Sequence, residues 1–173
     1  MHRAHSQGSC SCGMRSARLI LVLSTTAGLL SCQPRPEPLR FGEEICAYCQ
    51  MGISDPRFGA ELVTRQGRVI KFDAIECMVE FEHSGTVSAE RIHSRWVIDF
   101  SAPGQLIRVE EAEFVSTPEV RSPMGFNVYA VSRGAYESDP TLPRGQKLSW
   151  AEVQELVRRQ WREGPPLGAP QQH

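Results

Sequence analysis

Two neighbouring segments, Glu61-Leu-Val-Thr64 and Val69-Ile-Lys-Phe72, are rich in the apolar and β-branched residues that are typical of strands. The residues between them, Arg65-Gln-Gly-Arg68, include Gly67, which can adopt the positive φ that a tight turn needs. The pattern predicts a β-hairpin over residues 61–72.

A helical period follows the hairpin. Asp73 and Glu76 have the spacing of a capping box, and apolar residues between 74 and 81 form one wide face. The segment 96–100 is then rich in strand-forming residues. These elements together predict a ββαβ unit over residues 45–100.

The second half of the chain repeats this order more loosely. Segments 112–115 and 127–131 are predicted strands, and the loop 121–126 between them contains Pro and Gly. Ser149 and Glu152 form a second capping-box pattern, which predicts the start of a helix.

We therefore predict an α+β fold with two small ββαβ-type units, residues 45–100 and 101–162, that form one compact protein. Residues 163–173 are rich in Pro and Gly and are predicted to be a disordered tail. The composition, with 40% hydrophobic and 23% charged residues, is that of a folded protein. The net charge of −1 gives no reason to expect nucleic-acid binding.

The N-terminal segment has the features of a bacterial lipoprotein signal peptide. Arg15 and Arg18 precede the apolar run 19–30, and Ser31-Cys32 follows it. We predict removal of residues 1–31, lipidation of Cys32 and an extracytoplasmic protein anchored to the inner or outer membrane. The alternative is an ordinary signal peptide in which Cys32 is incidental.

Residues 32–44 contain the alternating prolines of Gln33-Pro-Arg-Pro-Glu-Pro38, which favour an extended spacer between membrane and domain. Translation could also start at Met14. Loss of Arg3, Arg15 and Arg18 leaves 16 basic against 20 acidic residues, so the mature chain carries about −4 at neutral pH.

Cys46-Ala-Tyr-Cys49-Gln-Met51 places two thiols and a thioether within one short segment. Thiolate and thioether sulfurs are soft donors and select Cu(I) over harder ions. A thioether also stays a ligand across the pH range in which thiols compete with protons. Cys46, Cys49 and Met51 are therefore the predicted core of a Cu(I) site.

Three other interpretations of the cysteine pair remain. Zinc would need four ligands, and only Cys77, His83 and His93 could supplement the pair, none at ligand-pair spacing. A thioredoxin-type redox pair would follow a strand, and no strand pattern precedes Cys46. A structural disulfide would leave the methionine without a role.

Met124 lies between Pro123 and Gly125 in a predicted loop, where a methionine is a poor core residue, so it is a second candidate ligand. Cys77 lies on the apolar face of the predicted helix, which favours a buried, inert cysteine. His83 and His93 are expected on the surface.

The sequence resembles the NosL family of copper-binding lipoproteins, which are accessory to nitrous oxide reductase. The resemblance rests on four motifs in order: Cys46-x-Tyr-Cys49-x-Met51, Phe58-Gly-Ala-Glu-Leu-Val-Thr64, Phe72-Asp-Ala-Ile-Glu-Cys-Met78 and Arg121-Ser-Pro-Met-Gly125. It implies two small β-β-α-β-type units and a Cu(I) site formed by Cys46, Cys49, Met51 and Met124.

The resemblance also implies a function. A NosL-like protein would be a metallochaperone, without enzymatic activity, that delivers copper to the nitrous oxide reductase maturation machinery, including its membrane ABC-type Nos complex. Two alternatives use the same residues: a periplasmic thiol–disulfide oxidoreductase, and a copper-sequestering lipoprotein with no role in nitrous oxide reduction.

Overall fold

The computed structural model describes residues 33–163. The predicted signal peptide, Cys32 and the tail from residue 164 onward lie outside the described residues. Within residues 33–163, no helix is both long and apolar enough to span a bilayer.

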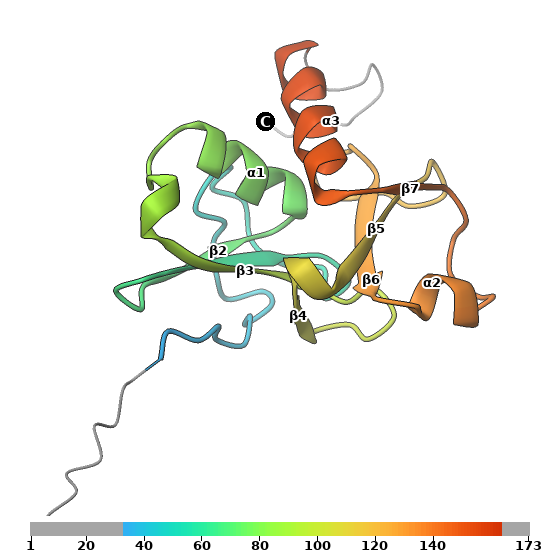
Figure 1. Cartoon of the computed structure of the whole chain (residues 1–173), viewed down its shortest axis with the longest axis horizontal. Coiled ribbons are helices and arrows are strands. Elements are labelled where there is room, and N and C mark those ends of the chain that lie inside the picture. The colour runs from blue at the N-terminus through green and yellow to red at the C-terminus, as the bar shows by residue number, and fades with distance from the viewer. Residues whose placement is uncertain (1–32, 164–173) are drawn as a thin grey trace, which may run out of the picture. The chain divides into compact units, whose positions relative to one another are not determined.

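A four-stranded antiparallel sheet forms the first half of the domain (Figure 1). Its strands are β1 (Ala60–Thr64), β2 (Val69–Phe72), β3 (Ile92–Ile98) and β4 (Leu106–Arg108), in the order β2-β1-β3-β4. The predicted hairpin is confirmed, with Glu61 opposite Lys71 and Gly67 at a φ of +82° in the turn. β2 is thus an edge strand.

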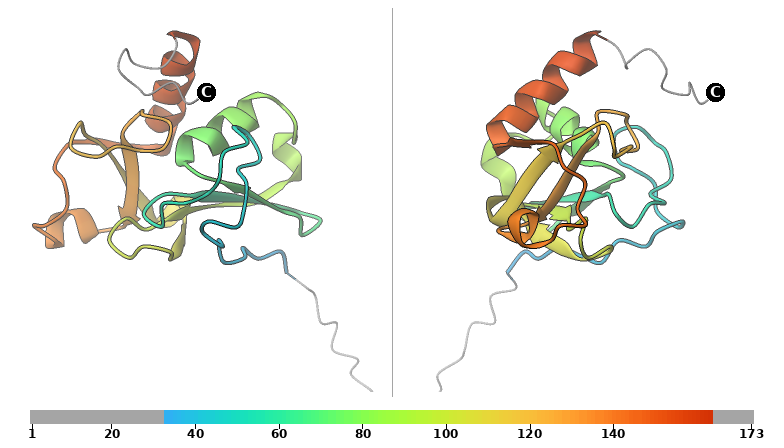
Figure 2. Two further views of the ribbon diagram at one scale, coloured as in Figure 1. Left: turned by 180° about the vertical axis from the view of Figure 1, so that it is seen from behind. Right: turned by 90° about the vertical axis from the view of Figure 1, so that its right-hand side faces the viewer.

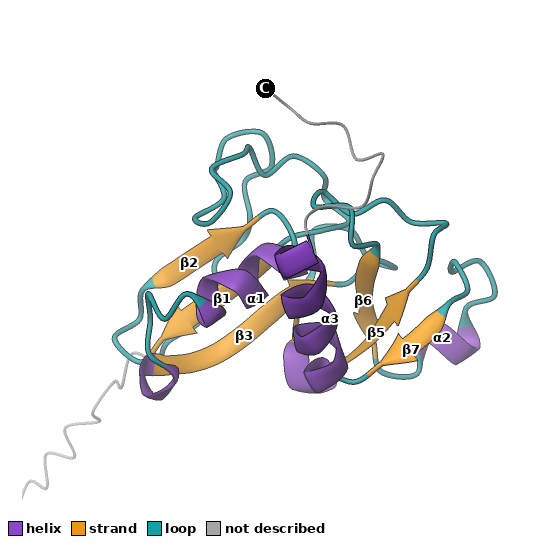
Figure 3. Ribbon diagram, turned by 90° about the horizontal axis from the view of Figure 1, so that it is seen from above, coloured by secondary structure: helices purple, strands orange, loops and turns teal. Residues whose placement is uncertain are grey.

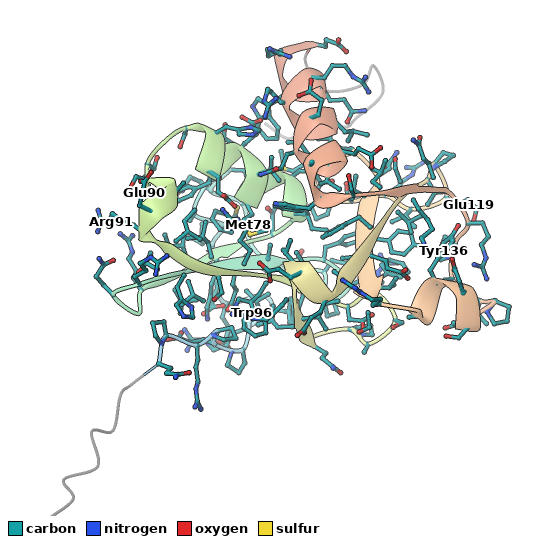
Figure 4. The ribbon with its side chains drawn as sticks, in the orientation of Figure 1. Met78, Glu90, Arg91, Trp96, Glu119 and Tyr136 are labelled. Atoms are coloured by element: carbon teal, nitrogen blue, oxygen red, sulfur yellow. The ribbon has the colours of Figure 1, made fainter. Side chains whose placement is uncertain are left out.

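Helix α1 (Ile75–His83) lies across one face of this sheet (Figure 3). Met78 of α1 is fully buried between the helix and the sheet, whereas Trp96 of β3 lies on the opposite face of the sheet (Figure 4). The predicted capping box is wrong, because the N-cap is Ala74 and no side chain caps the helix. Asp73 and Glu76 are both buried instead and make contacts described below.

A three-stranded sheet forms the second half, in the order β6-β5-β7. Its strands are β5 (Ala112–Ser116), β6 (Val128–Ser132) and β7 (Gln146–Leu148). A short helix, α2 (Ala135–Ser138), connects β6 to β7, and the 3-10 turns Ala89–Arg91 and Val109–Glu111 precede β3 and β5. The α+β class and the two small sheets match the prediction.

Helix α3 (Trp150–Glu163) packs on α1 and joins the two halves. The capping box predicted at its start is confirmed: the backbone N–H of Ser149 donates to Glu152 Oε2 over 2.7 Å, and the N–H of Glu152 donates to Ser149 Oγ over 3.3 Å. Val153 and Val157 of α3 belong to a hydrophobic core that also includes residues of both sheets.

The segment 33–44, which we call the N-terminal strap, runs along the sheet face opposite α1 and then rises beside the sheet (Figure 2). Leu39 is buried against this face. Glu61 of β1 accepts the backbone N–H of Glu37 over 3.0 Å, and Lys71 pairs with Glu44 over 2.8 Å. From Glu37 onward, the strap is therefore part of the folded domain.

Candidate metal centre

The cysteine pair lies in a short irregular hairpin, residues 45–52, which we call the thiol loop. Its ends are joined by a bridge between Ile45 and Gly52, and the Cys46 N–H donates to the Met51 carbonyl over 2.8 Å. The Ala47 N–H donates to the Lys71 carbonyl on the edge of β2 over 2.9 Å. The thiol loop is thus attached to the sheet through its first limb.

The tip of the thiol loop requires an uncommon backbone conformation. Gln50 has a φ of +64°, in the left-handed region that non-glycine residues rarely adopt. Its side-chain amide donates to the carbonyls of Cys46 and Ala47, each over 3.2 Å, which stabilises the turn. The turn brings Cys49 back toward Cys46.

Two further groups of the centre come from the start of α1. Asp73 follows the last residue of β2, and Cys77 lies four residues later, one helical turn on. Because the chain turns from the edge strand into the helix at this point, both side chains reach the side of the sheet on which the thiol loop lies.

The four groups converge. The sulfur atoms of Cys46, Cys49 and Cys77 and a carboxylate oxygen of Asp73 all lie within 4.8 Å of one another. All three cysteines are free thiols. Cys46 and Cys77 are fully buried, whereas Cys49 is half-buried and gives the centre its contact with solvent.

The closeness of the three thiols separates their acidities. The neighbouring thiols of Cys49 and Cys77 stabilise the ionised form of Cys46 and lower the pKa of Cys46 far below its usual range. Cys46 in turn raises the pKa of Cys49 to about 12 and also raises the pKa of Cys77. Cys46 is therefore the thiol of the cluster that ionises most readily.

Asp73 completes this arrangement. The thiol of Cys49 donates to Asp73 Oδ2 over 3.4 Å, while Oδ1 is buried without a hydrogen-bond partner among the described residues. Burial and the negative charge of Cys46 raise the pKa of Asp73 to about 6. An acceptor atom is thus left unsatisfied next to three sulfurs, which is the donor set of a soft or borderline metal ion.

The thiol loop also contains Met51, which is half-exposed and whose carbonyl closes the loop. Met124 lies in the segment 121–126, which we call the Met124 loop, and is partly buried against the core. The hydroxyl of Ser122 in this loop donates to Glu76 and accepts the Asn127 N–H over 2.9 Å. Since Glu76 precedes Cys77, this contact attaches the Met124 loop to the helix of the metal centre.

The sequence pattern identified the Cys46–Cys49 pair but not its partners. Cys77 is buried, as predicted, yet it faces the other two thiols rather than only apolar side chains. The sequence pattern predicts a helix cap at Asp73, whereas the structure shows no side-chain cap on α1. One feature of the sequence could have identified these partners: Asp73 and Cys77 lie four residues apart, directly after the strand that ends at Phe72. His83 and His93 are exposed and lie outside the cluster, as expected.

The family model NosL matches residues 40–139, which include the whole centre. The chain belongs to the NosL family. A comparison with curated proteins gave no match.

The fold of this NosL-family chain is also similar to a solved structure, the copper chaperone NosL from Shewanella denitrificans. The TM-score is 0.55 at 19% sequence identity, and the match covers 69% of this chain and 96% of the other. At this identity the likeness shows the fold. It agrees with the two small antiparallel sheets and helices described above.

Proposed function

We propose that this NosL-family protein is a Cu(I) chaperone of the cell envelope that holds its cargo through Cys46, Cys49 and Cys77. One observation carries the proposal: three thiol sulfurs from a loop and a helix meet within 4.8 Å, in a family whose solved relative is a copper chaperone. Three soft donors at this spacing suit Cu(I), which prefers thiolate and thioether sulfur.

The two methionines are further candidate donors. Met51 shares the thiol loop, and the Met124 loop is attached to α1 through Ser122 and Glu76. A neutral thioether can complete the coordination of Cu(I) without adding charge to a centre of cysteine ligands. We assign Met51 and Met124 this supporting role.

The exposure of the three thiols indicates the side from which a recipient protein would approach the metal ion. Cys46 and Cys77 are fully buried, so a donor from a recipient protein can approach only on the side of Cys49. Exchange would begin with replacement of Cys49 by the incoming donor, while the two buried sulfurs retain the ion until the second donor arrives.

The recipient in this proposal is the machinery that assembles the copper centre of nitrous oxide reductase, including its membrane ABC-type complex. Lipidation of Cys32 would hold the chaperone at the same membrane. Because the strap joins the folded domain at Glu37, only residues 33–36 would separate the anchored cysteine from the domain. Restriction to the membrane surface raises the effective concentration of donor and recipient.

Zinc is a second candidate cargo, favoured by the presence of Asp73. Three cysteine sulfurs and one carboxylate oxygen are the donors of a tetrahedral zinc site. A thiol–disulfide oxidoreductase fits less well. Its attacking thiolate must be accessible, whereas the thiol with the lowered pKa, Cys46, is fully buried.

The test is competition for Cu(I) between the protein and a chromogenic chelator, for the wild type, Cys49→Ala and Met124→Ala. We expect the cysteine variant to lose most of its affinity and the methionine variant to lose less. Wild-type affinity in Cys49→Ala would disprove the site. Delivery is tested in the host by whether a gene deletion leaves nitrous oxide reductase without copper and whether Cys49→Ala fails to restore it.

A further inference from the structure

Trp161 lies in the last turn of α3 and contacts both loops of the metal centre. Its ring meets Tyr48 of the thiol loop at a centroid distance of 5.3 Å and an interplanar angle of 68°. It meets Phe126 of the Met124 loop at 5.4 Å and 81°. Both are edge-to-face contacts, a preferred geometry for aromatic pairs.

Residues other than Trp161 attach helix α3 to the core. Val153 and Val157 are fully buried, and Trp150 packs on Phe114 of β5 at a centroid distance of 5.3 Å. These contacts and the capping box fix the first part of the helix. Trp161 is half-buried, and its aromatic contacts are directed to the two loops.

The turn of the thiol loop, residues 47–50, is bonded to β2 through the backbone N–H of Ala47. Side chains hold the rest of the turn, because Cys49 donates to Asp73 and Gln50 donates to the carbonyls of Cys46 and Ala47. In the described part of the chain, no backbone hydrogen bond joins Tyr48 or Cys49 to either sheet. The ring of Tyr48 rests on Trp161 instead. Cys49, the half-exposed thiol, is the next residue.

We propose that Trp161 is a positioning residue that holds Cys49 in the metal centre. Through Tyr48 it fixes the turn of the thiol loop, and through Phe126 it fixes the Met124 loop on the other side. Movement of the last turn of α3 would release both loops together and allow the ion to leave. This inference rests on the proposed Cu(I) function, but its effect on the thiol loop does not require copper.

The first experiment measures Cu(I) transfer from the loaded protein to excess bathocuproine disulfonate by stopped-flow absorbance. We expect Trp161→Ala to transfer Cu(I) about tenfold faster than the wild type, which corresponds to about 1.4 kcal/mol. Trp161→Phe keeps an aromatic edge and should restore most of the wild-type rate. The matched control is Trp150→Ala, which removes the other tryptophan of α3 and should change the rate less than about twofold.

The second experiment uses the metal-free protein and measures the alkylation rate of Cys49 by iodoacetamide, with the modified cysteine identified by mass spectrometry. We expect faster alkylation in Trp161→Ala than in Trp150→Ala at equal helix content. Equal rates in the two variants would overturn the role of Trp161. If wild-type protein binds no Cu(I) but Trp161→Ala is alkylated faster, the proposed function fails and the positioning role stands.

Discussion

The sulfur atoms of Cys46 and Cys77 lie within 4.8 Å of each other, although one belongs to an irregular loop and the other to a helix. The edge strand β2 creates this proximity. Its carbonyl at Lys71 binds the thiol loop, and its last residue leads directly into the segment that carries Asp73 and Cys77. A two-cysteine motif thereby becomes a three-cysteine centre.

The first prediction concerns this third cysteine. Cys77→Ala should weaken Cu(I) binding by about tenfold or more, because a buried soft donor is lost from the centre. The measurement is chelator competition at neutral pH. Met78→Leu is the matched control, since Met78 is the buried neighbour on α1 and the substitution conserves its volume. If Cys77→Ala binds as tightly as Met78→Leu, Cys77 is not a ligand.

The second prediction separates copper from zinc at Asp73. Asp73→Asn can still accept the Cys49 thiol hydrogen through its amide oxygen, but it loses the negative charge. Because Cu(I) is held by sulfur, its affinity should change less than about threefold, whereas zinc affinity should fall about tenfold or more when a carboxylate ligand is lost. The measurement is parallel titration of the wild type and Asp73→Asn with each metal. A large loss of Cu(I) affinity would make Asp73 a copper ligand.

The sequence predicted those parts of the fold that carry a long or regular pattern. The hairpin over 61–72 has two segments of strand-forming residues around a glycine turn, and the Ser149–Glu152 capping box marks the start of α3. Strands β4 and β7 are three residues each, and α2 is a single turn. Segments of this length carry too little periodicity to be recognised.

The metal centre shows a different limit. Cys46 and Cys49 are close in sequence, so their spacing alone indicated a shared site. The contribution of Cys77 depends on the docking of α1 beside the thiol loop, which is a tertiary contact. Asp73 satisfies a local rule for helix caps, but its carboxylate accepts the thiol of Cys49 and does not cap α1.

The third prediction concerns the contact between Ser122 and Glu76. Glu76 is fully buried, its Oε2 has no hydrogen-bond partner among residues 33–163, and burial raises its pKa to about 7. Ser122→Ala removes a donor from this carboxyl group and should lower the free energy of unfolding by about 1–3 kcal/mol. Chemical denaturation followed by circular dichroism measures the loss.

An exposed hydroxyl supplies the control for this measurement. Ser138→Ala removes a serine that bonds only local carbonyls at α2 and should change stability by less than about 0.5 kcal/mol. A double-mutant cycle with Glu76→Gln should show a coupling energy between positions 76 and 122. Additive effects would mean that the two side chains act independently, and the Met124 loop would then need another attachment to α1.

The last prediction concerns Glu61, which attaches the N-terminal strap to β1. Glu61 is fully buried, and its Oε1 has no partner among the described residues. Burial raises its pKa from 4.5 to about 7. The folded state therefore binds this proton more tightly than the unfolded state does. The stabilising contribution is fully present below about pH 4.5 and is lost as the pH rises through about 7.

Glu61→Gln cannot ionise and keeps an oxygen that can accept the Glu37 N–H. We expect the variant to match the wild type at about pH 4.5 and to exceed its unfolding free energy by about 1–3 kcal/mol at about pH 8. Asp73 and Glu76 also have raised pKa values, but they are present in both proteins and cancel in the difference. Denaturant unfolding across this pH range is the measurement. Glu43→Gln, which removes an exposed carboxylate from the same strap, is the matched control. If Glu61→Gln behaves like Glu43→Gln, the Glu61 carboxyl group does not carry the predicted proton.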